Sequence, residues 1–211
     1  WAGKPESEVR NGLLVPALKA LAFEPRPGKA AGDSRAEPDF RLVDPASKEP
    51  LALCLAYPWD RYLDGKDSKD IVSPEENPGQ AVVSLLEQGE VQWAVVTNGK
   101  HWRLYSAKAH SRATNYYEID LEEVLAADNK DPQDSFRYFW LLFRQAAFRP
   151  PDCFLDHLLR GSAEYAKRLG ERLKERVFEG IFPHLAEGFI EYAKAKKVFS
   201  AGDAEATEEF L

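Results

Sequence analysis

The sequence is poor in the residues that build disulfide frameworks and zinc sites. Its two cysteines, Cys54 and Cys153, lie far apart, which excludes a disulfide-dense scaffold and a CxxC metal knuckle. The four histidines also lack the short spacing that places two ligands on one helical face: His101, His110, His157 and His184. We therefore expect no zinc site.

Long apolar runs are missing as well. No stretch approaches the roughly 18 consecutive apolar residues that a membrane span needs, and no leader with an apolar core and a cleavage site is present. The expected location is the cytoplasm, without a membrane partner. The chain opens at Trp1, contains no methionine and stops at Leu211 within an acidic stretch, so we expect a fragment of a longer protein.

The sequence also lacks an excess of positive charge. The chain has 35 acidic and 28 basic residues, a net charge of -7, which argues against gripping nucleic acid by bulk electrostatics. Any DNA contact must therefore be local. With 44% hydrophobic residues over 211 positions, the chain can bury a substantial core and belongs to the soluble globular class.

The periodicity of the first half predicts helices alternating with strands. Apolar residues recur at helical spacing from Glu6 to Phe23, and Pro25 to Gly32 breaks that pattern. Two strands, Pro38 to Val43 and Leu51 to Tyr57, flank turn residues and should form an antiparallel hairpin. A long polar loop from Pro58 to Pro78 and a short helix from Gly79 to Gln88 are expected to follow.

The clearest local signal is a hairpin from Val91 to Ser106, because Asn98-Gly99 tolerates the positive φ angles of a tight turn. We expect the tryptophans of this hairpin, Trp93 and Trp102, to pack in the core. A further strand should cover Tyr116 to Ile119. Asp120 and Glu123 then form a capping box ahead of a helix from Leu121 to Ala127.

From Asp131 onward the pattern is helical. An aromatic, mostly buried helix should extend through Phe148 and end at Pro150-Pro151. A charged helix is expected from about Gly161 to Gly180, followed by a break at Pro183 and a helix from His184 to about Lys197. The charged helix carries an apolar stripe of five residues: Tyr165, Leu169, Leu173, Val177 and Ile181.

The order of elements resembles the PD-(D/E)XK nuclease superfamily: a helix, a strand bearing Pro38-Asp39, a neighbouring strand, and a helix opening with Gln80. In that superfamily a Glu-x-Lys follows the Pro-Asp strand. Two carboxylates hold Mg²⁺, the metal stabilises charge on the scissile phosphate, and the lysine helps to activate water. Residues i and i+2 share a strand face, so Glu and Lys point to the same phosphate.

A wider resemblance covers nearly the whole chain. The segments SEVRNGLLVPALKALAF, AEPDFRL, VQWAVVTNGKHWRLY, NYYEIDLEEVL and SFRYFWLLF are similar to the nuclease-like front end of single-chain type IIG restriction-modification enzymes. The segment SAEYAKRLGERLKERVFEGIFPHLAEGF resembles the connector to their adenine methyltransferase domain. This implies an α/β fold, restriction-endonuclease-like, with a mixed sheet of four or five strands over residues 1–128. An all-helical connector would span 129–211, with the boundary near Ala127 to Asp131.

Carried over residue by residue, the resemblance places vestigial site positions at Glu8, Asp39, Leu55, Tyr57 and Gln80. Asp39 falls at the metal-binding aspartate, and the Glu-x-Lys falls on Leu55-Ala56-Tyr57. Leucine offers no oxygen to Mg²⁺, and tyrosine is a poor substitute for the lysine ammonium. The same strand face also carries Leu51 and Leu53, so we expect metal-dependent cleavage to be absent or very weak.

Three of these positions also have an ordinary structural explanation. Asp39 can be a strand-edge aspartate, Glu8 a solvated helix residue and Gln80 a helix cap. A second possibility is that a neighbouring carboxylate supplies a displaced metal ligand, and the candidates are Asp44, Glu49, Asp60 and Asp64. Candidate DNA contacts in the connector are Lys167, Arg168, Arg172, Lys174 and Arg176, which can equally form a solvated face laced with glutamates.

The expected function is a degenerate, cleavage-inactive nuclease-like module of a bacterial restriction-modification or phage-defence DNA methyltransferase, serving DNA engagement or domain positioning. Its partners would be double-stranded DNA and the methyltransferase domain. No cofactor is expected in these residues, because S-adenosylmethionine would bind the methyltransferase domain and no Asn-Pro-Pro-Tyr motif occurs. Two alternatives stay open: a Mg²⁺-dependent endonuclease with a rearranged site, and a protein-docking module without DNA contact.

Overall fold

The computed structural model describes residues 1–28, 37–70, 73–109, 112–126 and 132–196. The chain divides by compactness into two units, unit 1 from Trp1 to His157 and unit 2 from Leu158 to Leu211. The boundary expected from the sequence, between residues 128 and 129, lies outside the described residues. Among the described residues, no helix is both long enough and apolar enough to cross a membrane.

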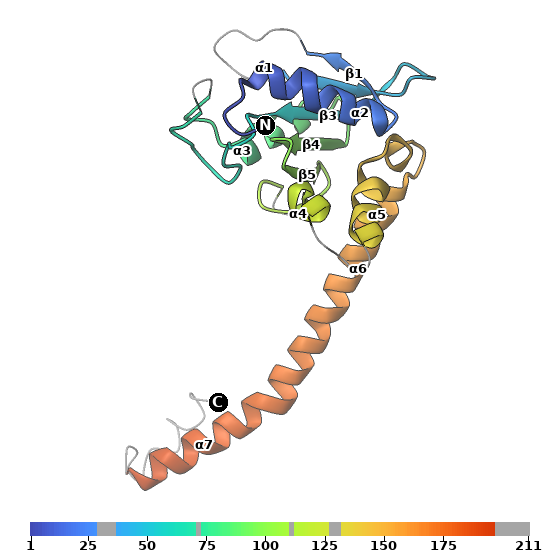
Figure 1. Cartoon of the computed structure of the whole chain (residues 1–211). Coiled ribbons are helices and arrows are strands. Elements are labelled where there is room, and N and C mark those ends of the chain that lie inside the picture. Colours follow the sequence, from blue (N-terminus) through green and yellow to red (C-terminus); the bar gives the residue numbers. More distant parts are fainter. Residues whose placement is uncertain (29–36, 71–72, 110–111, 127–131, 197–211) are drawn as a thin grey trace. The chain divides into compact units, whose positions relative to one another are not determined.

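Unit 1 is built on a six-stranded sheet with the order β1-β2-β3-β4-β5-β6 (Figure 1). Its strands are β1 (Glu24–Pro27), β2 (Phe40–Val43), β3 (Pro50–Ala56), β4 (Trp93–Thr97), β5 (His101–Ser106) and β6 (Tyr116–Asp120). The sheet is mixed, because β3 and β4 pair in parallel and every other neighbouring pair is antiparallel. The predicted mixed α/β class and both predicted hairpins are confirmed.

Helices precede, interrupt and follow this sheet. They are α1 (Glu6–Val9), a π-helical turn η1 (Arg10–Leu14), α2 (Val15–Ala20), α3 (Pro78–Leu86), α4 (Leu121–Ala126), α5 (Pro132–Phe143) and a 3-10 turn η2 (Gln145–Phe148). Helix α3 lies in the connection that makes β3 and β4 parallel, since a parallel pair needs a crossover rather than a tight turn. At α4 the predicted cap is present, because the backbone N–H of Glu123 donates to Asp120 at 2.9 Å.

The edge strand β1 was not predicted, and it brings the number of strands to six instead of four or five. It contains Pro25 and Pro27, which lack backbone N–H donors and argue against a strand. Among the described strands its one neighbour is β2, with Glu24 opposite Val43 and Pro27 opposite Phe40. Proline is tolerated at a sheet edge because one side of the strand needs no donors.

The two faces of the sheet carry different helices. Leu53 and Leu55 of β3 form one buried cluster with Val82 and Leu85 of α3. Side chains alternate between faces along a strand, so Cys54 points the other way, as does its partner Phe40. The guanidinium of Arg10 lies 5.4 Å from the Phe40 ring centre, which places the N-terminal helical segment on the face opposite α3.

Helix α5 packs on the same face as the N-terminal segment. Phe139 and Phe143 meet the ring of the buried Trp102 edge-on, with centres 5.2 and 5.8 Å apart. The prediction of one mostly buried helix through Phe148 is wrong in two respects. Phe136 and Trp140 are exposed, and the helix ends because Arg144 is extended, which lets the N–H of Gln145 donate to Leu21 of the N-terminal segment at 2.8 Å.

Unit 2 is described as continuous helix up to residue 196. Helix α6 (Phe154–Glu175) begins in unit 1 and passes into a π-helical turn η3 (Arg176–Ile181), and α7 (Phe182–Ala195) follows directly (Figure 1). The predicted start near Gly161 and the predicted break at Pro183 are therefore wrong. Proline is compatible with this helix because Pro183 falls in the first turn of α7, where a missing N–H costs least.

Candidate functional site

Asp39 directly precedes β2 and lies beside the end of β3. Its Oδ2 atom accepts a hydrogen bond from the backbone N–H of Ala56 at 2.8 Å. Its Oδ1 atom lies 2.5 Å from the guanidinium of Arg10. The hairpin thus brings Asp39 next to the Leu55-Ala56-Tyr57 segment, as the sequence predicts, but both carboxylate oxygens have protein partners.

Arg10 bridges two carboxylates from different elements. Its Nη2 atom bonds Glu6 of α1 at 2.8 Å as well as Asp39, and its position in η1 carries the guanidinium over Phe40. A guanidinium supplies only N–H donors and one fixed positive charge. A charge of the same sign as Mg²⁺ therefore occupies the space between the two acids.

The helix carboxylate that shares a partner with Asp39 is Glu6 rather than the predicted Glu8. Glu8 instead forms an i, i+4 ion pair with Lys4 at 3.0 Å, and both side chains are about half exposed. The sequence gives little signal for the choice, because both glutamates lie in the first turn of α1. Only the packing of that helix on the sheet distinguishes them.

Leu55 and Tyr57 are fully buried in the cluster that faces α3. The backbone N–H of Tyr57 donates to Thr97 at 2.9 Å, and its hydroxyl donates to the carboxylate of Glu76. The hydrocarbon wall predicted for this strand face is present, since Leu53 belongs to the same cluster. No oxygen ligand stands at the Leu55 position, and the Tyr57 hydroxyl is already held by Glu76.

Gln80 lies in the first turn of α3, with its side chain exposed. Its backbone N–H points to Asn77, which is the N-cap of the helix and also accepts from Gly79 at 3.0 Å. A helix cap was the ordinary role expected of Gln80 from the sequence. In the structure, Asn77 caps α3 instead. Nothing in these contacts directs the Gln80 amide toward Asp39.

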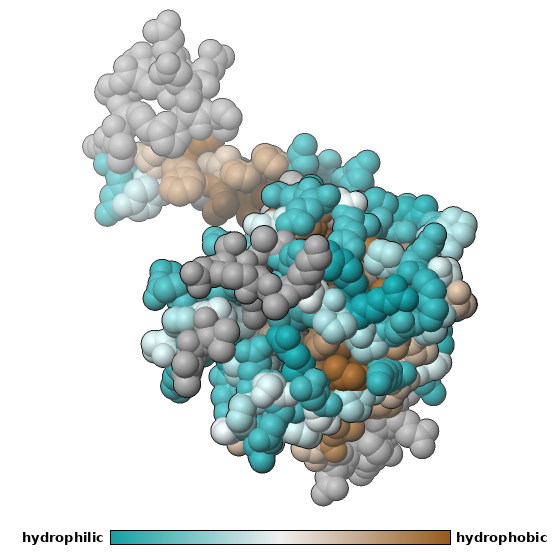
Figure 2. Space-filling model, turned by 90° about the horizontal axis from the view of Figure 1, so that it is seen from above, coloured by the Kyte–Doolittle hydropathy of each residue, from teal (hydrophilic) through white to brown (hydrophobic). Residues whose placement is uncertain are grey.

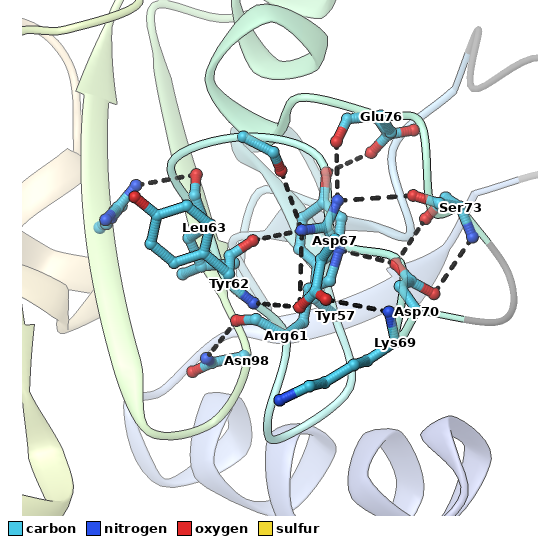
Figure 3. Close-up of polar contacts among 12 residues, drawn as sticks. Tyr57, Arg61, Tyr62, Leu63, Asp67, Lys69, Asp70, Ser73, Glu76 and Asn98 are labelled. Carbon is cyan, nitrogen blue, oxygen red and sulfur yellow. Dashed lines mark hydrogen bonds and ion pairs between the residues drawn. The ribbon is translucent and has the colours of Figure 1, made fainter.

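A buried polar cluster around Arg61 was missed by sequence reasoning (Figure 3). Arg61 and Asp70 form an ion pair at 2.8 Å in which neither side chain is exposed. The remaining guanidinium N–H groups donate to backbone carbonyls of the same loop: Tyr62, Gly65, Ser73 and Glu76. The Asn98 amide reaches the Arg61 carbonyl oxygen at 3.0 Å, which joins the loop to the β4–β5 turn.

Asp64, one of the possible displaced metal ligands, is held by Arg103. Arg103 lies 2.8 Å from Oδ1 of Asp64 and donates to Oδ2 at 2.9 Å, and the Tyr116 hydroxyl donates to Oδ1 at 2.9 Å. The hydrogen bond from Arg103 lowers the pKa of Asp64. Burial acts to lower the pKa of Arg103, but its bonds to Asp64 and Glu118 outweigh that effect and raise it.

The other displaced candidates are no closer to forming a metal site. Asp44 accepts from the backbone N–H of Ala46 at 2.9 Å, which lowers its pKa, and it pairs with Arg149 at 3.3 Å. Asp60 and Glu49 are exposed. Across the described ranges, no group of three or more His, Cys, Asp or Glu side chains is placed to hold a metal ion. The residues around Asp39 do not fit Mg²⁺, because the Arg10 guanidinium lies between Glu6 and Asp39 and Leu55 offers no oxygen.

The candidate DNA contacts all lie in unit 2. Their side chains are exposed on α6 and the start of η3: Lys167, Arg168, Arg172, Lys174 and Arg176. A shallow hollow is lined by Arg168 and Arg172 together with Tyr165 and Leu169. The surface thus combines positive charge with apolar area, which suits both phosphate contact and protein contact.

Comparison with protein-family models found no match, and searches of curated proteins and of solved structures found none either. The function is therefore argued from the residues of this chain.

Proposed function

We propose that this chain is a degenerate nuclease-like module, restriction-endonuclease-like in fold, of a bacterial restriction-modification or phage-defence DNA methyltransferase. In this proposal it engages double-stranded DNA or positions the methyltransferase domain without cutting DNA. Methyl transfer from S-adenosylmethionine belongs to the methyltransferase domain. The observation that carries the proposal is the Arg10 guanidinium between Glu6 and Asp39, beside a wholly buried Leu55.

The chemistry of phosphodiester cleavage explains why this observation matters. A Mg²⁺-dependent nuclease needs oxygen ligands that are free to bind the metal and a group that assists the attacking water. Here Asp39 is engaged by Arg10 and by the backbone of Ala56, and Tyr57 donates to Glu76. The scaffold that would position the reactive groups remains, while the groups themselves serve packing and ion pairing.

A nicking assay on supercoiled plasmid tests the loss of cleavage. The chain is incubated with Mg²⁺ or Mn²⁺, and Asp39→Ala is the paired variant. We expect no strand breaks above the background of the buffer from either protein. Metal-dependent nicking that disappears in Asp39→Ala would refute the inactive module and establish the rearranged endonuclease instead.

DNA engagement is assigned to the basic side chains of α6 and η3. Lysine and arginine contacts to phosphate make binding fall steeply with salt, by a slope of about 0.9 per phosphate contact on logarithmic axes. We expect a flatter salt dependence from a variant with five glutamine substitutions, at Lys167, Arg168, Arg172, Lys174 and Arg176. The variant should also bind more weakly, and by the same factor for duplexes of unrelated sequence. Fluorescence anisotropy against a labelled duplex measures both quantities.

The matched control places five glutamine substitutions on exposed lysines of unit 1: Lys4, Lys19, Lys66, Lys69 and Lys108. These should leave the salt slope unchanged. Binding that is absent in the unmodified chain, or equal in both sets of variants, would rule out DNA engagement through unit 2. The docking alternative is favoured by the exposed apolar side chains along the same helix.

A further inference from the structure

The helix of unit 2 carries a row of large apolar side chains that no described part of unit 2 covers. Each has between 49% and 65% of its surface exposed: Tyr165, Leu169, Leu173, Leu185, Phe189 and Tyr192. Apolar side chains gather along this helix in the space-filling view (Figure 2). A contiguous apolar surface of this kind on a polar helix indicates a binding face.

The π-helical turn η3 reduces how far this row winds around the helix. Residues four positions apart in an α-helix are separated by about 400°, which is about 40° more than a full turn. Over the six such steps from Tyr165 to Phe189, the row would wind about 240° around the axis. A π-helical turn accommodates about one extra residue, which removes roughly 100° of that drift. Leu185 therefore lies roughly 20° around the axis from Leu173 and Phe189 roughly 60°, while the whole row from Tyr165 to Phe189 winds about 140° instead of 240°.

Charge is divided between the two halves of the same helix. Residues 158–176 contain six basic and three acidic side chains, a net charge of +3. Residues 177–195, up to the end of α7, contain three glutamates and one lysine, Lys194, a net charge of -2 when His184 is neutral. The sign changes between Arg176 and Val177, near the middle of the helical part of unit 2.

We propose that this face binds a second copy of the chain, with the two helices antiparallel. An antiparallel pair places the basic half of each helix beside the acidic half of the other, and a twofold axis near Arg176 makes both contacts equivalent. A parallel pair would place like charges side by side. The inference does not rest on the proposed function, because it uses only the apolar row and the charge pattern.

The size of the face suits a stable homodimer. An aromatic side chain buries roughly 150–250 Å² when fully covered, so half-exposed side chains contribute on the order of 100 Å² each. The five aromatic side chains of this face, Tyr165, Phe178, Phe182, Phe189 and Tyr192, then supply roughly 500 Å² per copy, and Leu169, Leu173, Ile181 and Leu185 add to that area, against about 800 Å² per partner in a standard interface.

Sedimentation equilibrium of the chain, without DNA, tests the dimer. One variant reverses the basic half (Lys167→Glu, Arg172→Glu, Lys174→Glu), and a second reverses the acidic half (Glu179→Lys, Glu187→Lys, Glu191→Lys). The unmodified chain should sediment at twice its 23.8 kDa mass. Each variant alone should dimerise at least tenfold more weakly, and an equimolar mixture should recover the dimer, because opposite charges again meet.

The control carries Lys19→Glu, Lys69→Glu and Lys108→Glu in unit 1 and matches the charge change of the first variant. It should dimerise like the unmodified chain. Far-ultraviolet circular dichroism checks that all variants keep their helix. A monomeric unmodified chain, or a mixture that fails to recover the dimer, overturns the proposal, as does dimerisation unaffected in both reversed variants.

Discussion

The guanidinium of Arg10 lies 2.5 Å from Oδ1 of Asp39, and the same guanidinium bonds Glu6 at 2.8 Å. This arrangement joins the first turn of the N-terminal helix to the start of β2. It satisfies both acids without a metal ion, because arginine supplies the positive charge and the N–H donors. The three residues therefore connect the sheet to its covering helix.

Replacing Arg10 with alanine should destabilise unit 1. Asp39 is only 13% exposed at its side chain, so losing its charged partner leaves a largely desolvated carboxylate. The loss in unfolding free energy should be roughly 1–3 kcal/mol, the range for bonds to charged groups in such settings. Urea unfolding followed by circular dichroism measures it.

The control is Lys4→Ala, which removes the exposed ion pair to Glu8. Surface pairs of this kind contribute about 0–1 kcal/mol, so this variant should unfold almost like the unmodified chain. Equal losses of unfolding free energy in Arg10→Ala and Lys4→Ala would show that Arg10 stabilises the fold no more than an exposed surface residue does.

The buried pair between Arg61 and Asp70 gives a second prediction. Asp70→Ala leaves the buried Arg61 guanidinium with the more distant Asp67 carboxylate, 4.0 Å away, as its remaining ion-pair partner among the described residues. Breaking a buried pair in this way costs roughly 3–5 kcal/mol. The thermal midpoint should fall sharply, whereas Glu75→Ala, which removes an exposed pair with Lys66, should leave it nearly unchanged. Similar midpoints for both variants would argue against a structural role for the buried pair.

Elements encoded by neighbouring residues were predictable from the sequence. The turn at Asn98-Gly99 forms because Asn98 Oδ1 accepts from the backbone N–H groups of Lys100 and His101 at 3.0 and 2.7 Å. Gly99 adopts a φ of +88° there. These determinants lie within three residues of one another, so a local pattern identifies them.

Features that depend on tertiary packing were not predictable. Strand β1 exists because β2 offers it a free edge, although its two prolines argue locally against a strand. The partners of Arg61 are mostly backbone carbonyls, which leave no spacing signature in the sequence. In the candidate site, the predicted hairpin was enough to locate Asp39 beside Ala56. The contact of Arg10 with Asp39 was not predictable, because it depends on how the N-terminal helical segment packs on the sheet.

Acid should weaken the fold partly through Asp64. Because Arg103 lowers its pKa, Asp64 stays ionised in the folded chain at pH values where the unfolded chain has begun to bind a proton. Its contribution is therefore complete above the unfolded value of about 3.9 and is lost as the pH falls through the lower folded value.

Asp64→Asn should accordingly be less stable than the unmodified chain at pH 6, and the two should converge as the pH falls below about 3.9. Urea unfolding at half-unit pH intervals gives the two curves. A constant difference between them across this range would mean that the Asp64 carboxylate charge contributes nothing to stability.

The glycine of the β4–β5 turn provides the last prediction, because two glycines with positive φ differ in their surroundings. A Cβ atom on Gly99 would lie 2.8 Å from the Leu13 side chain and 3.2 Å from the Trp59 ring, whereas a Cβ atom on Gly89 (φ +76°) meets nothing within 4 Å. Gly89→Ala should therefore cost only the left-handed backbone strain, about 1–2 kcal/mol. Gly99→Ala should cost roughly 1–3 kcal/mol more, from overpacking against the N-terminal segment. Equal costs in urea unfolding would mean that Leu13 and Trp59 do not close over this turn in solution.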